Sequence, residues 1–276
     1  MTKIYCDIAD INQIKKFNRK KFVKGFTTNP TLMRKAGAKD YSNYTKKILK
    51  LTNKPVSCEV FADEPIEMIH QGIKINRLGK NIFVKVPVTN SKGAFMGKVI
   101  KKLNSKNIKL NITAVYTSKQ TKQILSKINN KTKVIISIFA GRMADVGKDP
   151  VPEFINSLKL SKKFKNVEIL WASTREPYNY IQAKQLKCHI ITVPPAIIEK
   201  IEKFGKSFKN LTIDTVKGFL IDSKKSKFKI WIGCGGRIWT ADLKVMSLAS
   251  YQAAPPRDNY ALIHYNLFNK RKKIFL

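Results

Sequence analysis

Short runs of β-branched and other apolar residues recur along the first 200 residues, and the stretches between them carry apolar residues three and four positions apart. Runs of the first kind are typical of buried strands, and the second spacing is typical of amphipathic helices. We therefore predict eight strands, at residues 4–8, 22–26, 55–61, 81–88, 108–115, 133–139, 167–171 and 189–193. The clearest intervening helices are predicted at residues 65–77, 93–104, 118–128 and 151–164.

Strands that alternate with helices indicate βα units on a parallel sheet. Eight such units within roughly 210 residues match a (β/α)8 TIM barrel, so we predict an α/β fold of this class. Two further helical stretches, at 195–204 and 213–219, follow the eighth strand and predict an additional C-terminal helix. A doubly wound sheet is the alternative, although it usually has fewer strands with helices on two faces.

The character of the sequence changes after Phe228. Residues 231–259 hold two of the three tryptophans and lack the Lys, Ile and Asn bias of the preceding chain. Within them, GGRIWTADLKVMSLASYQAAPPRD resembles the peptide obtained when a tRNA gene is conceptually translated. We therefore predict a barrel over residues 1–228 and a tail over 229–276 that is a read-through or frame-shifted extension without structure of its own. A small oligomerisation tail and a flexible arm remain alternatives.

The chain is strongly basic, with 54 Lys and Arg against 18 Asp and Glu and a formal charge of +36. Only 8 of the 54 are Arg, and the Lys residues are scattered over nearly every segment. A nucleic-acid reader is expected to cluster its charge and to use Arg for bidentate contacts. We therefore attribute the excess to an AT-rich coding sequence and expect no nucleic-acid partner. A basic nucleic-acid-associated protein remains the alternative.

Several other classes of protein are disfavoured. No apolar run approaches the ~18 residues that span a bilayer, and the N-terminal residues lack the apolar stretch of a signal peptide, so we expect a cytoplasmic protein without a membrane partner. The cysteines lack C-x-x-C spacing and the histidines are well separated, which predicts no metal site and no disulfide framework. These residues are Cys6, Cys58, Cys188, Cys234, His70, His189 and His264.

One lysine interrupts the fourth predicted strand. In a barrel, functional residues project from the C-terminal ends of the strands, and Lys85 lies in the otherwise apolar run NIFVKVPV. An unpaired buried ammonium is costly, and a desolvated lysine is a nucleophile suited to Schiff-base formation with a carbonyl. A lysine that extends to solvent from a strand end, or one paired with a carboxylate for structural reasons, would give the same pattern.

Other polar groups follow the predicted strands. Two carboxylates suited to proton transfer end the first and third strands, hydroxyl and amide groups suited to placing a water lie on the fifth and sixth, and two arginines suited to phosphate follow the sixth and seventh. Residues two apart share a strand face, which pairs Asn111 with Thr113 and Ser137 with Phe139, and would pair Ser173 with Arg175 if the seventh strand extended that far. The remaining members of the set are Asp7, Glu59 and Arg142.

At these residues the sequence resembles the transaldolase family of class I aldolase-type barrels. The resemblance covers residues 1 to about 225 and is carried by five motifs in order, and the length indicates the short subfamily that also contains fructose-6-phosphate aldolases. The motifs are Gly25–Thr31 (GFTTNPT), Val84–Pro87 (VKVP), Asn111–Val115 (NITAV), Ile136–Asp145 (ISIFAGRMAD) and Leu170–Glu176 (LWASTRE).

The resemblance implies a role for each matched residue. Lys85 would form the Schiff base with the ketose carbonyl, Asp7 would take the proton of the C4 hydroxyl, and Glu59 with Thr113 would hold the water that shuttles protons. Asn29 and Asn111 would bind the hydroxyls of the dihydroxyacetone unit. Three residues, Arg142, Ser173 and Arg175, would hold the phosphate. The other substrate-binding residues that we expect are Thr27, Ser137 and Phe139.

Two positions favour transfer over cleavage within this resemblance. Aldolase members carry Gln where this chain has Glu59, and Tyr where it has Phe139, and a tyrosine hydroxyl there helps water to release the three-carbon enamine. We therefore expect a transaldolase of the pentose phosphate pathway that acts on sugar phosphates without a cofactor or metal, as a homo-oligomer. Fructose-6-phosphate aldolase-type cleavage is the alternative. The chain departs from the family at Ala140, where a bulkier residue is usual, and in its tail.

Overall fold

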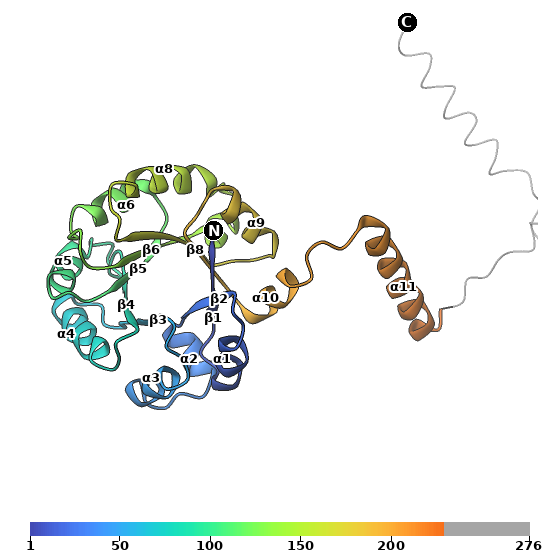
Figure 1. Cartoon of the computed structure of the whole chain (residues 1–276), viewed down its shortest axis with the longest axis horizontal. Coiled ribbons are helices and arrows are strands. Elements are labelled where there is room, and N and C mark those ends of the chain that lie inside the picture. Colours follow the sequence, from blue (N-terminus) through green and yellow to red (C-terminus); the bar gives the residue numbers. More distant parts are fainter. Residues whose placement is uncertain (229–276) are drawn as a thin grey trace, which may run out of the picture. The chain divides into compact units, whose positions relative to one another are not determined.

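Eight parallel strands close into a barrel in chain order, as seen along the barrel in Figure 1. The computed structural model describes residues 1–228. The TIM-barrel prediction is confirmed, and each strand end lies within two residues of its predicted position, so the doubly wound alternative is wrong. The strands are β1 Lys3–Asp7, β2 Val23–Thr27, β3 Val56–Glu59, β4 Ile82–Pro87, β5 Leu110–Val115, β6 Val134–Phe139, β7 Val167–Ala172 and β8 Ile190–Val193.

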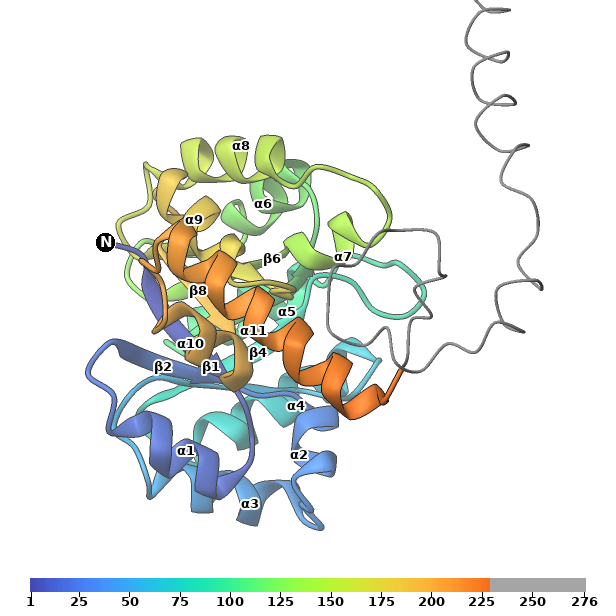
Figure 2. The same cartoon turned by 90° about the vertical axis from the view of Figure 1, so that its right-hand side faces the viewer.

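Helices surround the strands, and Figure 2 shows the barrel from the side, with α6 and α8 along one wall and α1 and α3 along the opposite one. The four predicted crossover helices are present as α4, α5, α6 and α8. The helices are α1 Ile11–Asn18, α2 Pro30–Lys35, α3 Tyr41–Leu49, α4 Pro65–Asn76, α5 Gly97–Ser105, α6 Ser118–Leu125, α7 Ala140–Ala144, α8 Val151–Ser161, α9 Tyr178–Gln185, α10 Pro195–Ile201 and α11 Phe208–Ser226. None of them, within residues 1–228, is long and apolar enough to cross a bilayer.

The helix predicted from residue 93 begins four residues later. The amide of Gly93 donates to the carbonyl of Asn90, and the Asn90 amide donates to the Ala94 carbonyl, so these residues form a tight turn. Gly93 takes a φ of 80°, which glycine adopts without the steric penalty that a side chain brings. The turn satisfies its own backbone groups, and α5 therefore starts only at Gly97.

Three unpredicted helices, α1 to α3, carry clear N-terminal caps. The side chains of Asp10, Asn29 and Asp40 accept hydrogen bonds from the first-turn amides of α1, α2 and α3 respectively. Pro30 also occupies the first turn of α2, where its fixed φ suits a helix start. These capping signals were present in the sequence and would have located the helices.

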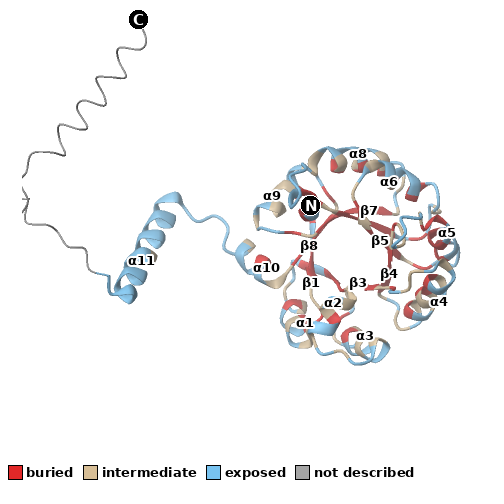
Figure 3. Cartoon of the chain, turned by 180° about the vertical axis from the view of Figure 1, so that it is seen from behind, coloured by how far each residue is buried: buried red, intermediate tan, exposed pale blue. Residues whose placement is uncertain are grey.

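The strands of the barrel are mostly buried, as Figure 3 shows. Because successive side chains of a strand point to opposite faces, one set packs outward against the helices and the other fills the barrel. The filling set forms an apolar layer toward the amino ends of the strands, made by Tyr5, Phe83, Ile135, Leu170 and Ile190. We call this set the apolar layer.

One contact within the apolar layer requires glycine. A Cβ placed on Gly25 of β2 would lie 2.6 Å from ring atoms of Tyr5. Because real Cβ atoms do not approach other atoms so closely, the missing side chain of Gly25 gives the Tyr5 ring its place in the barrel. The result is a closed floor beneath the polar residues that follow on the same strand faces.

The chain divides into two compact units, Met1–Lys206 and a second that begins at Ser207. The first contains the whole barrel and α10, which occupies the first of the two predicted C-terminal helical stretches. In the second unit α11 spans 19 residues, longer than the predicted 213–219, and none of them is buried. The predicted boundary at Phe228 and the tail 229–276, with Cys234 and His264, lie at or outside the edge of the described residues and stay predictions.

Candidate active site

A cavity of about 240 Å³ opens at the carboxyl ends of the strands. Most of its lining residues lie in the carboxyl halves of the strands or shortly after them, as expected for the functional end of a barrel. They are Asp7, Thr27, Asn29, Lys85, Asn111, Thr113, Ser137, Phe139, Arg142, Ala172, Ser173, Thr174, Arg175, Thr192 and Pro194. Eleven of the twelve sequence-predicted site residues are in this lining, and the twelfth, Glu59, contacts Lys85.

Lys85 lies on β4 with its side chain in the barrel and is only 8% exposed. Its Nζ lies 3.2 Å from Oε2 of Glu59 and donates to the backbone carbonyl of Thr28 at 3.4 Å. Strand register brings the acid and the amine together, because Glu59 on β3 is the Cα partner of Lys85, which in turn is the partner of Asn111 on β5. Lys85 is therefore paired with a carboxylate and also lines the cavity.

A second carboxylate faces the same cavity from β1. Asp7 accepts a hydrogen bond from Oγ1 of Thr27 at 2.6 Å, and that hydroxyl lies 2.5 Å from the hydroxyl of Thr192. Burial raises the pKa of Asp7, while the charge of Lys85 and the Thr27 hydrogen bond partly offset the rise. A carboxyl group with a raised pKa is suited to accepting and returning a proton.

Amide and hydroxyl groups of β3, β5 and β6 form a buried chain of hydrogen bonds. Nδ2 of Asn111 donates to Oγ of Ser57 at 2.9 Å, and Oγ of Ser137 donates to Oδ1 of Asn111 at 2.7 Å. Both ends of the Asn111 amide are thus fixed. Thr113, on the same face of β5, has a buried Oγ1 without a hydrogen-bond partner among residues 1–228. That hydroxyl is available to a water or a ligand in the cavity.

Two guanidinium groups line the cavity just after the carboxyl ends of β6 and β7. Arg142 on α7 lies with its Cζ 5.6 Å from the centre of the Phe139 ring. Arg175 is held by Asp145, with Nε donating to one carboxylate oxygen at 2.9 Å and Nη2 to the other at 2.5 Å. This bidentate geometry fixes the plane of the guanidinium, and the pairing lowers the pKa of the Asp145 carboxyl.

The seventh strand does not extend to Ser173 and Arg175, so the condition under which these two residues would share a strand face is not met. β7 ends at Ala172, and Ser173 turns into the left-handed region with φ 63°. Its carbonyl oxygen then lies against Gly141, where a Cβ would come within 1.7 Å of it. Gly141 lies in α7 directly before Arg142, so this backbone contact joins the helix that carries Arg142 to Ser173.

Asn29, a predicted site residue, also stabilises a helix, and the cavity includes residues that the sequence did not predict. Asn29 caps α2 through its Oδ1 at 2.8 Å, which leaves its amide group free to face the cavity. The sequence reasoning missed Ser57, Thr192 and Thr174, whose hydroxyl donates to the Thr192 carbonyl at 2.7 Å. The two-residue periodicity that paired Asn111 with Thr113 also places Ser57 on the face of Glu59 and would have found it.

Residues 1–228 contain no group of three or more His, Cys, Asp or Glu side chains that could hold a metal ion. Cys6, Cys58 and Cys188 are buried free thiols, and burial raises the pKa of Cys58 and of Cys188 to about 12. A thiol that remains protonated is a poor nucleophile. The cavity groups that could react are therefore the amine of Lys85 and the carboxylate of Asp7, with the Glu59 carboxylate beside Lys85.

The sequence profile of the Transaldolase/Fructose-6-phosphate aldolase family matches residues 4–230. A protein of Thermoplasma volcanium described as a probable transaldolase is 35% identical over 227 residues, which cover 81% of this chain and 96% of that protein. Proteins with the same description from Nitrosopumilus maritimus and Clostridioides difficile are 32% and 31% identical, over 82% and 83% of this chain and 96% and 100% of theirs.

Solved structures with the same architecture are more distant in sequence. A dihydrodipicolinate synthase from Thermotoga maritima superposes with a TM-score of 0.54 at 10% identity, over 80% of this chain and 78% of that one. The 4-hydroxy-tetrahydrodipicolinate synthase of Methylacidiphilum fumariolicum gives 0.52 at 10% identity, over 71% and 69%. At this level of identity the similarity supports the barrel fold alone.

Proposed function

Because this chain belongs to the transaldolase/fructose-6-phosphate aldolase family, we propose that it transfers a dihydroxyacetone unit from a ketose phosphate to an aldose phosphate through a Schiff base on Lys85. The observation that carries the proposal is the placement of one buried amine, Lys85, beside one carboxylate, Glu59, in a cavity lined by a second, Asp7. An amine that attacks a carbonyl needs a proton acceptor at hand, and breaking a carbon–carbon bond needs a second one.

In the proposed first stage, the Lys85 ammonium gives a proton to Glu59, and the free amine adds to the C2 carbonyl of the ketose. Two protons reach the carbonyl oxygen through a water held by Glu59 and Thr113, one from Glu59 and one from the attached nitrogen, and the oxygen leaves as water to give the iminium ion. The Thr113 hydroxyl, which has no hydrogen-bond partner among residues 1–228, supports a water at this place. Asn111, fixed at both ends by Ser57 and Ser137, would bind a hydroxyl of the substrate.

In the proposed second stage, Asp7 takes the proton of the C4 hydroxyl. The electron pair of the C3–C4 bond moves into the iminium, so an aldose phosphate leaves and an enamine stays on Lys85. An acceptor aldehyde then enters, C3 of the enamine attacks it, and Asp7 returns its proton to the new hydroxyl. The raised pKa of Asp7 supports this role, because the group must hold a proton while the first aldose is exchanged for the second.

The phosphate groups of both sugars would bind at Arg142, Ser173 and Arg175. Guanidinium groups recognise phosphate oxygens through their N–H donors, and both arginines line the cavity. Arg175, whose Nε and Nη2 donate to Asp145, would offer its remaining N–H donors. The aldehyde and ketone carbons would then lie toward Lys85, at the other side of the cavity. Sedoheptulose 7-phosphate and fructose 6-phosphate are the proposed donors, and erythrose 4-phosphate and glyceraldehyde 3-phosphate the proposed acceptors.

Transfer is proposed in preference to simple cleavage because Phe139 brings no hydroxyl into the cavity that it lines. Without a donor there, water is less able to protonate the enamine, and the three-carbon unit persists until an acceptor arrives. Aldol cleavage of the fructose-6-phosphate aldolase type is the second candidate. The proposal also includes action in the pentose phosphate pathway of the cytoplasm, without cofactor or metal and as a homo-oligomer.

Borohydride trapping tests the mechanism directly. Incubation with fructose 6-phosphate and borohydride should fix a reduced three-carbon adduct on Lys85, located by peptide mass mapping. Lys85→Met should abolish the adduct, while Lys46→Met, on the exposed face of α3, should leave it unchanged. An adduct that survives Lys85→Met, or trapping that fails in the wild-type enzyme, would exclude the Schiff base. Release of dihydroxyacetone with and without an added aldose phosphate then distinguishes cleavage from transfer.

A further inference from the structure

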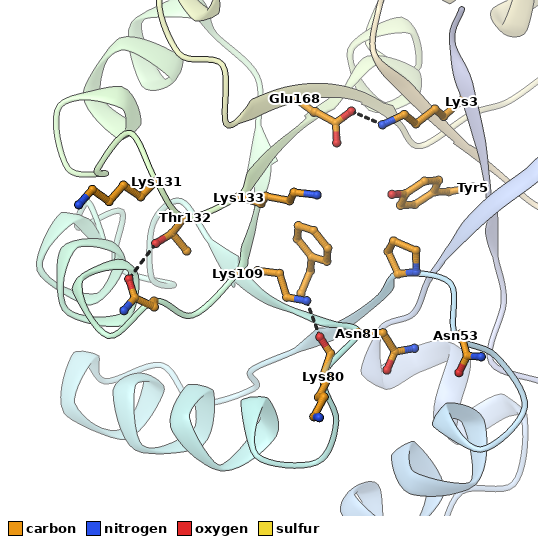
Figure 4. Close-up of a pocket in the computed structure, with 13 residues that line it drawn as sticks. Lys3, Tyr5, Asn53, Lys80, Asn81, Lys109, Lys131, Thr132, Lys133 and Glu168 are labelled. Carbon is orange, nitrogen blue, oxygen red and sulfur yellow. Dashed lines mark hydrogen bonds and ion pairs between the residues drawn. The ribbon is translucent and has the colours of Figure 1, made fainter.

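A second hollow, of about 780 Å³, lies at the opposite end of the barrel from the Lys85 cavity. Its floor includes Tyr5 and Phe83, which lie two residues before Asp7 and Lys85 on the same strand faces. Figure 4 shows its polar lining, which contains five lysines and a single carboxylate. The charged residues are Lys3, Lys80, Lys109, Lys131, Lys133 and Glu168.

The topology explains why these lysines meet. Lys109 directly precedes β5, Lys133 directly precedes β6, and Lys3 begins β1. Since the amino ends of parallel strands share one mouth of the barrel, residues scattered over 130 positions of sequence converge there. In Figure 4 the side chain of Lys133 points into the hollow toward Tyr5, and that of Lys109 reaches toward the carbonyl of Lys80.

Positive charge in this hollow is largely uncompensated. Glu168 is paired with Lys3 at 2.6 Å, so the one carboxylate is already neutralised. Lys80, Lys109, Lys131 and Lys133 have no ion pair within residues 1–228, and Lys109 lies 5.4 Å from the centre of the Phe83 ring. Burial and the nearby charge of Lys133 lower the pKa of Lys109, as expected where like charges are held together.

An adjoining hollow of about 710 Å³ extends the basic surface beneath β7 and β8. It shares Lys3, Lys131, Lys133 and Glu168 with the first hollow and adds Lys162, Lys165 and His189. Nδ1 of His189 accepts a hydrogen bond from the amide of Ile169 at 3.0 Å, which leaves the proton of the neutral ring on Nε2. The two hollows together offer seven lysines.

We propose that these two hollows form one binding site for an oligophosphate chain, either free or as part of a nucleoside triphosphate. The lysines converge on two adjoining concave surfaces that share residues. A ligand that fits them must therefore carry several negative charges within a short distance. Ammonium groups bind phosphate as point charges, and a concave surface lined by one sign of charge concentrates counter-ions. The site is independent of the proposed enzymatic function.

Binding of inorganic triphosphate, measured by isothermal titration calorimetry, tests the site. Wild-type protein should bind it, and Lys109→Gln/Lys133→Gln should weaken binding by about tenfold or more, the loss expected for two charge-assisted contacts. The matched control is Lys46→Gln/Lys47→Gln, which removes the same charge from the exposed face of α3 and should change affinity less than about twofold. Equal weakening in both variants would reduce the effect to general surface charge and overturn the proposal.

Further arms separate this site from the catalytic cavity and identify the source of the phosphate. Arg142→Gln should leave triphosphate binding intact. If this variant no longer bound triphosphate, the anion would bind in the catalytic cavity and the proposal would be overturned. ATP that binds more tightly than triphosphate would identify a nucleoside triphosphate, and equal affinities would identify the free chain. Binding of an RNA strand without binding of triphosphate would also overturn it. If Lys109→Gln/Lys133→Gln has a lowered melting temperature, Lys131→Gln/Lys133→Gln serves as the second variant for the same measurement.

Discussion

The carboxylate of Glu59 lies 3.2 Å from the ammonium of Lys85, and the two residues are Cα partners on adjacent strands. Register therefore fixes this pair as firmly as the barrel itself. The same register continues to Asn111, so three neighbouring strands present an acid, an amine and an amide at one level of the barrel. A site that is built on paired strand positions keeps its geometry without help from loops.

Glu59→Gln should lower kcat by about a hundredfold or more while KM changes much less, because the change removes a proton acceptor and keeps the shape of the side chain. Steady-state kinetics with fructose 6-phosphate and erythrose 4-phosphate measure both constants. The control is Glu64→Gln, which breaks the exposed pair with Lys92 and should leave kcat unchanged. A normal kcat in Glu59→Gln would show that the pair has only a structural role.

Asp7→Asn should abolish transfer and raise the melting temperature at neutral pH. Because burial raises the folded-state pKa of Asp7 above the unfolded value near about 4, the folded protein binds the extra proton between the two values. Wild-type stability therefore falls as pH rises through that window. The advantage of Asp7→Asn should be absent at low pH, grow through the window and stay constant above it.

Melting curves across pH measure this difference, and Asp63→Asn provides a control of opposite sign. Hydrogen bonds from Ser91 lower the pKa of Asp63, so its contribution to stability is present above the unfolded value and is lost as pH falls. Asp63→Asn should therefore melt at or below the wild-type temperature at neutral pH. If the melting temperature of Asp7→Asn fell relative to that of the wild type as pH rose through the window, the inferred cost of charging Asp7 would be contradicted.

Arg175→Met should raise KM for fructose 6-phosphate by about tenfold or more, since a charge-assisted contact to phosphate contributes about 1.5–3 kcal/mol. Turnover of an unphosphorylated acceptor, such as glyceraldehyde, should be affected much less than that of its phosphate. The ratio of the two is the informative measurement. Arg77→Met, at the exposed C-terminal end of α4, serves as the matched control. An equal effect on both acceptors would remove Arg175 from the phosphate site.

Gly141→Ala should destabilise the protein by about 1–3 kcal/mol, the usual cost of overpacking, because its Cβ would meet the Ser173 carbonyl at 1.7 Å. The backbone must then move on one side, which displaces Arg142 or Ser173 and should also raise KM. Denaturant unfolding measures the stability. Gly218→Ala on α11, where a Cβ meets nothing within 4 Å, should be neutral or stabilising. A Gly141→Ala protein with wild-type stability and KM would refute the contact.

Phe139→Tyr should convert part of the transfer activity into cleavage. The new hydroxyl would lie in the cavity and help water to protonate the enamine, so dihydroxyacetone should be released from fructose 6-phosphate without an acceptor. Quantifying free dihydroxyacetone over time gives the partition between the two activities. Phe61→Tyr, an exposed aromatic change elsewhere, should not alter it. A partition that stays the same in Phe139→Tyr would remove the argument for transfer based on this position.

The strands and most site residues could be predicted because they depend on local pattern. A buried strand needs an apolar run, and Lys85 stood out because it interrupts one. The turn at Gly93 and the end of β7 at Ala172 depend on backbone torsions and on contacts with distant segments. The contact between Gly141 and Ser173 joins residues 32 positions apart, so the local sequence around either residue does not predict it. The lysines at the amino mouth are scattered along the sequence, and only closure of the barrel gathers them.

The apolar layer of Tyr5, Phe83, Ile135, Leu170 and Ile190 crosses the barrel between its two mouths. These apolar side chains separate the two mouths. Moving an anion along the barrel axis would require removing it from water into an apolar environment, which is energetically costly. Changes at either mouth can therefore be introduced and selected separately. Residues at one mouth of the barrel can therefore be redesigned without altering the chemistry of the other mouth.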